Sequence, residues 1–137
     1  MSDYLVLRVI AKLLIPFILL FGFYVQMHGD YGPGGGFQAG VIVAAAFILY
    51  AIVFDVKTAQ RVVPMTILVS LACLGVLLYA GVGIANLLYG GLFLEYGVFS
   101  HDPAHGNHIG ILIIEIGVGT AVAAVMMIIF FSFARRR

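Results

Sequence analysis

The sequence contains no tryptophan, one cysteine and very few charged residues. Charged side chains make up 9% of the 137 residues, against roughly 25% in a typical soluble domain. Hydrophobic residues make up 64%. So few charges cannot cover a water-exposed surface, and the composition therefore excludes an ordinary soluble protein. It indicates a bilayer as the solvent for most of the chain.

Motifs that carry chemistry are also absent. The single cysteine, Cys73, excludes a disulfide within the chain, and its place in an apolar run predicts a small buried hydrophobe. The sequence has no phosphate-binding glycine loop, no HExxH pair, no cysteine cluster and no nucleophile beside a base. We therefore predict that the chain is not an enzyme and has neither a metal site nor a cofactor. Its seven basic residues are too few to indicate nucleic-acid binding.

Four apolar runs are long enough to cross a bilayer, which takes about 20 helical residues. They cover approximately residues 9–27, 36–54, 63–89 and 109–133. The connections between them are too short to fold independently, so residues 1–137 are treated as a single membrane domain. The predicted fold is that of an all-α integral membrane protein with four transmembrane helices.

All basic residues lie near alternate ends of these runs. Two precede the first run, two lie between the second and third, and three follow the fourth: Arg8, Lys12, Lys57, Arg61, Arg135, Arg136 and Arg137. Residues 28–35 and 95–108 include none. With four spans, the three basic regions fall on one side, which the positive-inside rule makes cytoplasmic. Both termini are therefore predicted to be cytoplasmic, with the glycine-rich segment 28–40 at the outer face.

The segment HGDYGPGGGFQAG, residues 28–40, joins the first two runs and contains six glycines. Pro33 suits the first turn of a helix, and Gly34 and Gly35 permit a tight turn at its start. Small residues then recur every four positions, at Gly36, Gly40 and Ala44. Such a stripe lets another helix approach closely in a membrane. The alternative is a loop whose backbone amides or carbonyls line an ion path.

Glu115 is the only acidic residue inside a predicted span. It lies about six residues into the fourth run, or roughly 9 Å from the outer end of that helix. A charge near the bilayer centre costs on the order of 3 kcal/mol, so a carboxyl group there is a candidate proton or cation site. The alternative is a neutral carboxyl group hydrogen-bonded to a neighbouring helix. Gly119 and Ala123 continue its face with small residues, so this face is expected to meet another helix or subunit.

Other polar side chains lie at a similar depth. His108 precedes Glu115 by seven residues and shares its face if the fourth helix extends that far. The outer ends of the first three predicted helices carry Gln26, Gln38 and Asn86, each suited to an interhelical hydrogen bond or to an ion path. The inner halves of the last three helices are almost wholly apolar. Because a proton relay needs polar groups across the whole membrane, we expect no transport by this chain alone.

Histidines gather in the segment SHDPAHGNHIG, at His101, His105 and His108, together with Asp102. A solvated outer loop accounts for them. Alternatively, the imidazoles buffer protons at an ion entrance or bind a metal weakly. Their spacing matches no strong zinc signature, so no metal site is predicted.

The run PGGGFQAG, followed by VIVAAAFILYAIVFD, resembles the MnhB (MrpB) family. This family comprises small subunits of multisubunit Mrp-type sodium/proton antiporters, and related subunits occur in membrane-bound hydrogenases. The resemblance covers nearly the whole chain in its length, four spans and glycine motif. It implies a structural role for the motif residues Pro33, Gly34, Gly35, Gly36 and Phe37, and it matches His28 to a histidine that precedes the motif.

The resemblance also implies a setting. Other membrane subunits would be the partners, within the lipid of a prokaryotic plasma membrane, and Na⁺ and H⁺ would be the transported ions. The expected function is an accessory antiporter subunit that contributes packing surface and an outer ion or proton half-path. The candidates for that path are Glu115, His108, His28, Asn86 and Gln38.

Three alternatives stay open at this point. The first is the equivalent subunit of a hydrogenase or other complex-I-like, redox-driven ion pump. The second is a pure assembly factor with no ion role. The third is a stand-alone four-helix transporter. Exporters of that size place their membrane acid in the first helix and rely on a tryptophan, whereas this chain has Glu115 in its fourth run and no tryptophan.

Overall fold

Helices make up nearly all of the described structure. The computed structural model describes residues 5–28, 35–88, 90 and 103–135. The elements are α1 (Leu5–His28), α2 (Gly36–Phe54), α3 (Val56–Val62), α4 (Met65–Leu88) and α5 (Pro103–Ala134). All but the short α3 are long and apolar enough to cross a membrane. The predicted fold class, all-α with four membrane-spanning helices, is thereby confirmed.

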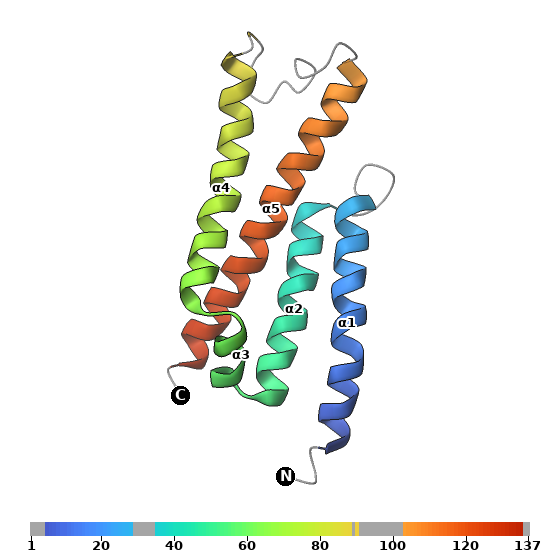
Figure 1. The fold of residues 1–137 in the computed structure, drawn as a ribbon, viewed down its shortest axis with the longest axis vertical. Coiled ribbons are helices and arrows are strands. Elements are labelled where there is room, and N and C mark those ends of the chain that lie inside the picture. The colour runs from blue at the N-terminus through green and yellow to red at the C-terminus, as the bar shows by residue number, and fades with distance from the viewer. Residues whose placement is uncertain (1–4, 29–34, 89, 91–102, 136–137) are drawn as a thin grey trace.

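The four long helices form an open row in the order α1, α2, α5, α4 (Figure 1). The extensive contacts are those between neighbours in this row, with α2 and α5 at its centre. The apolar runs alone do not predict this order, because α5 lies between α2 and α4 although it comes last in the sequence.

Glycines set the close contacts within the row. Gly36 and Gly40 of α2 are buried against α5, where a methyl group on Gly40 would lie 2.7 Å from the carbonyl oxygen of Gly119. On the other side of α5, a methyl group on Gly75 of α4 would lie 2.5 Å from the carbonyl oxygen of Gly117. Small residues are favoured where helix backbones approach this closely in membranes. Ala44, one turn after Gly40, is also buried.

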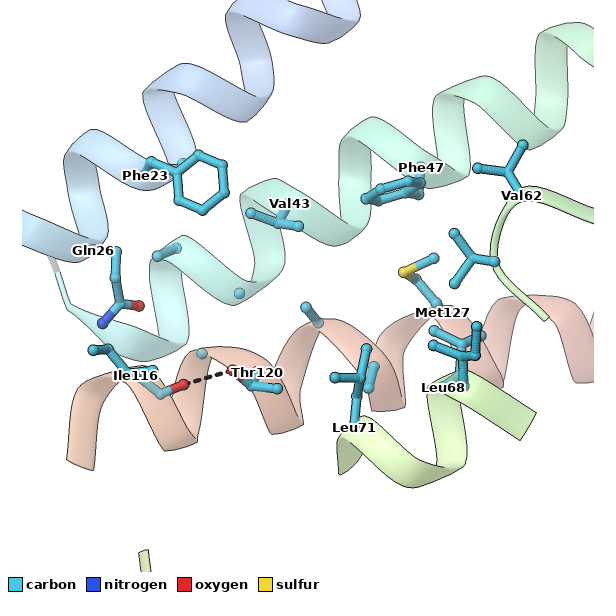
Figure 2. Close-up of a pocket in the computed structure, with 18 of the residues that line it drawn as sticks. Phe23, Gln26, Val43, Phe47, Val62, Leu68, Leu71, Ile116, Thr120 and Met127 are labelled. Atoms are coloured by element: carbon cyan, nitrogen blue, oxygen red, sulfur yellow. Dashed lines mark hydrogen bonds between the residues drawn. The ribbon is translucent and has the colours of Figure 1, made fainter. Parts of the chain in front are cut away.

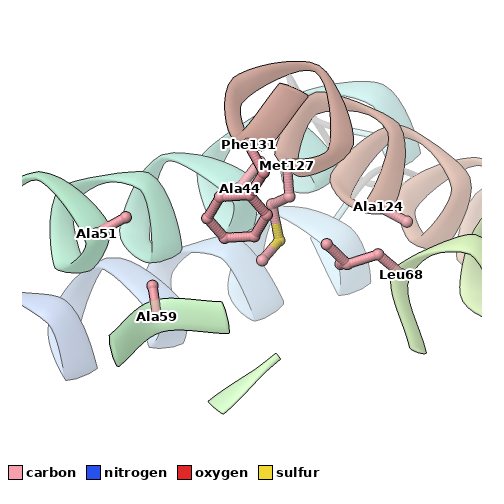
Figure 3. Close-up of a cluster of buried hydrophobic side chains, with 7 residues drawn as sticks. All are labelled: Ala44, Ala51, Ala59, Leu68, Ala124, Met127 and Phe131. Atoms are coloured by element: carbon pink, nitrogen blue, oxygen red, sulfur yellow. The ribbon is translucent and has the colours of Figure 1, made fainter. Parts of the chain in front are cut away.

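The hydrophobic core lies near one end of the row (Figure 3). It combines four alanines with three larger side chains from α2, α3, α4 and α5: Ala44, Ala51, Ala59, Leu68, Ala124, Met127 and Phe131. Ala59 belongs to α3, and its burial docks this short helix onto the bundle. The apolar periods of the sequence did not predict α3, which has only seven residues.

This end of the row also carries the described basic residues, and we call it the basic end. Lys57 and Arg61 are exposed on α3, and Arg135 follows the last helix at the same end (Figure 1). On α1, the Lys12 ammonium and the Arg8 guanidinium lie 5.5 and 5.9 Å from the centre of the Phe54 ring. These contacts join the start of α1 to the end of α2 through cation–π attraction.

The opposite end, which we call the far end, is stepped. Figure 1 shows α4 and α5 extending well beyond the ends of α1 and α2 that lie beside them. Helix α5 begins at Pro103 and includes residues 103–108, which were expected to be loop. Proline suits a first helical position, and this helps the helix start before its apolar part.

Two expectations therefore need correction. Glu115 is twelve residues from the start of α5, or roughly 18 Å along the helix, about twice the predicted distance from its outer end. Cys73 is exposed on α4, although it was predicted to be buried. The reason is that α4 packs through one side only, against α5, and presents the rest of its apolar surface outward.

Candidate functional site at the junction of α1, α2 and α5

Glu115 of α5 lies directly against the start of α2. A methyl group built on Gly35 would lie 3.8 Å from Oε1 of Glu115. One built on Gly36 would collide with the Glu115 backbone carbonyl. The Glu115 side chain is half-buried, and its Oε2 atom is fully buried. The absence of a side chain at Gly36 is thus what lets the backbone of α5 at Glu115 approach the start of α2 this closely.

The backbone at the start of α2 needs glycine for a second reason. Gly35 has φ 152°, in a region that residues with a side chain rarely adopt. Its carbonyl accepts the first hydrogen bond of the helix, from the amide of Ala39 at 3.0 Å. The three preceding amides, at residues 36–38, therefore have no partner within the helix. Together with the helix dipole, such amides attract a carboxylate.

Gln26 of α1 completes the junction. A methyl group on Gly119 would lie 2.6 Å from Oε1 of Gln26 and 3.2 Å from the carbonyl oxygen of Gly36. Gly119 is one turn after Glu115, on the face predicted to carry small residues. The Nε2 atom of Gln26 is buried, with no hydrogen-bond partner within the described part of the chain. Three helices therefore bring a carboxyl group, a carboxamide and backbone carbonyls together.

The remaining candidates lie at different distances from this junction. Gln38 is exposed, and its Oε1 atom would lie 3.3 Å from a methyl group on Gly35, so it folds over the start of α2. Asn86 is fully buried on α4. It lies eleven residues beyond Gly75, which faces Gly117 on α5 close to Glu115, and so it is roughly 16 Å nearer the far end than Gly75. The structure therefore separates Asn86 from Glu115, which the sequence placed at a similar depth.

Several predicted residues fall wholly or partly outside the described residues. Pro33, Gly34, His101 and Asp102 are among these. His28 is the last residue of α1, while His105 and His108 belong to α5, but their side chains are not described. His108 thus shares one continuous helix with Glu115, two turns away. Among the described residues, no group of three histidine, cysteine, aspartate or glutamate side chains is placed to hold a metal ion.

Comparison with known proteins identifies the family. Residues 6–128 match the family described as "Domain related to MnhB subunit of Na+/H+ antiporter". The chain belongs to the MnhB family. The antiporter subunit mnhB2 of Staphylococcus haemolyticus is 33% identical to it over 130 residues, which cover 93% of this chain and 92% of that protein.

Two further relatives agree with this assignment. The mnhB2 subunit of Staphylococcus aureus strain Newman is 33% identical over 135 residues, covering 96% of this chain and 95% of the relative. A Na⁺/H⁺ antiporter subunit of Bacillus subtilis is 34% identical over 92 residues, covering 67% of this chain and 64% of the relative. The resemblance read from the PGGGF motif is confirmed.

The sequence predicted Glu115 as a candidate in this MnhB chain, but it did not predict the partners that Glu115 meets. Gln26 appeared only as one polar residue near a helix end, and its position over Gly119 depends on how α1 packs. One sequence signal for this packing was available. Gly36 and Gly40 are four residues apart, and so are Glu115 and Gly119. These pairs lie opposite each other in the structure.

Proposed function

We propose that this MnhB-family chain is an accessory membrane subunit of a multisubunit Na⁺/H⁺ antiporter. In this proposal it supplies packing surface and the outer part of an ion or proton path, and other membrane subunits supply the rest. The names of its relatives as antiporter subunits favour this function over a hydrogenase subunit or a stand-alone transporter. The complex would lie in the plasma membrane of a prokaryote, with the basic end in the cytoplasm.

One observation carries the proposal: the distribution of polar groups along the long helices. Glu115 lies against the start of α2, and Gln26 lies over Gly119, one turn further along α5. Between that junction and the basic end, α2, α4 and α5 have no carboxyl, amine, guanidinium or imidazole group. Protons and cations need polar or hydrated groups to cross hydrocarbon. The chain can therefore contribute a path from the far end to Glu115, while the continuation toward the cytoplasm requires a neighbouring subunit.

Reconstitution into vesicles tests whether this chain needs the other subunits for ion transport. Vesicles that contain only the purified chain are expected to show no Na⁺-dependent proton flux above empty vesicles when a pH gradient is imposed. Vesicles with the complete complex should show flux, and a complex prepared without this chain should lose it. Robust flux from the isolated chain would contradict the proposal, as would full activity of a complex that lacks it.

Orientation provides a separate prediction. With Cys73 replaced by alanine, single cysteines are introduced by Lys57→Cys at the basic end and by Leu88→Cys at the far end. A membrane-impermeant maleimide should label the Leu88→Cys variant in intact cells and the Lys57→Cys variant only in inverted vesicles. The reason is that cytoplasmic segments retain lysine and arginine. Arg135→Cys serves as the control, since it must label like Lys57→Cys. Labelling of the Arg135→Cys and Lys57→Cys variants from opposite sides of the membrane would contradict the predicted topology.

A further inference from the structure

A long groove crosses the face formed by α2 and α5, between α1 and α4 (Figure 2). Its volume is about 640 Å³, and its walls include Phe23, Val43, Phe47, Leu71 and Met127. Of the residues that line it, only Gln26 and Thr120 are polar. The Thr120 hydroxyl donates a hydrogen bond to the carbonyl of Ile116, at 2.8 Å. The groove is thus suited to hydrocarbon along nearly its whole length.

The two ends of the groove differ in charge. One end is lined by Ile116, which adjoins Glu115 in the sequence. The other is lined by Val62 and Val63, which directly follow Arg61 of α3. Arg61 is exposed and makes no ion pair with another described residue. An anion would therefore be attracted to the second end, where Arg61 lies.

Basic side chains outnumber acidic ones at the basic end of the row. Lys57 is exposed one turn before Arg61 on α3, while Lys12 and Arg8 lie over the ring of Phe54 at the end of α2. Among the described residues of this end, the single carboxyl side chain is that of Asp55. Basic pockets between membrane helices on one side of the bilayer are typical binding sites for anionic lipid headgroups.

We propose that this groove binds one acyl chain of an anionic phospholipid, with the phosphate beside Arg61. The acyl chain lies along the apolar walls toward Gln26, and the guanidinium donates charge-assisted hydrogen bonds to phosphate oxygens. The opposite orientation would place the phosphate near Glu115. The inference does not depend on the antiport function, because it uses only the groove and the charges at its ends.

The shape of the groove favours a lipid over a transmembrane helix as its occupant. Val62, the last residue of α3, and Val63, which follows it, line the basic end of the groove, as Figure 2 shows for Val62. A helix that filled the groove and continued past its basic end would meet these residues. A lipid headgroup can lie beside them, with its narrow acyl chain entering the groove from the open side and ending toward Gln26.

Photolabelling of the purified complex in phosphatidylcholine nanodiscs tests the proposal. Two matched probes carry a diazirine on the same acyl carbon, one as phosphatidylglycerol and one as phosphatidylcholine. The labelled residues are mapped by mass spectrometry. We expect phosphatidylglycerol to label the groove residues Val43 and Leu71 roughly fivefold more than phosphatidylcholine, the order of preference expected for one basic residue near a membrane surface.

Two pairs of variants make the result specific. Arg61→Gln should abolish the preference for phosphatidylglycerol, whereas Arg135→Gln, at the same end but outside the groove lining, should retain it. Ala123→Phe fills the groove and should lower labelling by both lipids, whereas Ala45→Phe, on the exposed side of α2, should not. Copurification of the other subunits checks folding. If Ala123→Phe fails to assemble, the arginine pair still decides the question.

Three outcomes would overturn the proposal. Equal labelling of the groove by both lipids would identify it as ordinary boundary lipid. A preference for phosphatidylglycerol that is unchanged by Arg61→Gln would show that Arg61 does not bind the phosphate. Absence of lipid labels in the groove, with crosslinks from a photoreactive residue at Leu71 to another subunit of the complex, would show that a protein segment occupies it.

Discussion

Glu115→Gln is expected to leave the antiporter complex assembled and to lower its Na⁺-dependent proton flux by roughly a hundredfold, the lower range of what a lost proton-transfer group costs in enzymes. Glutamine has nearly the same shape as glutamate, so it can keep the same position beside Gly35 at the start of α2. It cannot bind and release a proton or carry a negative charge. Flux in vesicles and subunit copurification are the two measurements.

A matched control uses the other carboxyl group in the described helical region. Asp55→Asn changes a carboxylate to an amide at the basic end, where the side chain is exposed. It should leave flux within the error of the wild type. Glu115→Asp keeps the titratable group but shortens its reach to α2 by one methylene, and it should retain flux between those of the wild type and Glu115→Gln.

The contrary result is equally informative about this residue. If Glu115→Gln assembles and transports ions at the wild-type rate, the carboxyl group serves only as a hydrogen-bonding partner at the helix junction. The half-path would then have to use other groups. If the complex fails to assemble with Glu115→Gln but assembles with Glu115→Asp, the negative charge at the start of α2 is needed for folding, because helix N-termini attract carboxylates.

The long helices could be predicted because their signal is local. Helix α2 follows Gly35, which has a positive φ, and ends at Phe54, just before Asp55, whose φ is 104°, so both ends coincide with residues that interrupt a helix. Hydropathy then identifies the apolar residues between them. The short α3 and the early start of α5 at Pro103 gave no such signal, since both consist largely of residues that are not strongly apolar.

The packing of the helices could not be predicted, because α4 and α5 carry apolar residues on all sides. In a soluble helix a single apolar stripe marks the buried face, but a membrane helix can be apolar all round. Cys73 shows the consequence: its apolar neighbours suggested burial, and the structure exposes it. The same ambiguity hid the contact between Gln26 and Gly119. Only the regularly spaced glycines indicated which faces of the helices are in contact, since close approach needs small residues.

Gly75→Leu is therefore expected to have the largest effect on the fold. The first carbon of a side chain on Gly75 would lie 2.5 Å from the Gly117 carbonyl oxygen and 2.8 Å from Cβ of Ala121. Neither atom can move without shifting the backbone of α5. We expect a loss of about 3 kcal/mol in the free energy of unfolding, the upper range for overpacking, because α4 must separate from α5. Denaturation in mixed detergent micelles measures it.

Gly81→Leu is the matched control on the same helix. A side chain on Gly81 meets no atom within 4 Å, so leucine there only adds helix propensity and an apolar surface toward the outside. Its stability should equal or exceed that of the wild type by up to about 1 kcal/mol. Equal destabilisation by the two substitutions would mean that α4 does not use the Gly75 face. The contact between α5 and α4, the last in the row α1–α2–α5–α4, would then be contradicted.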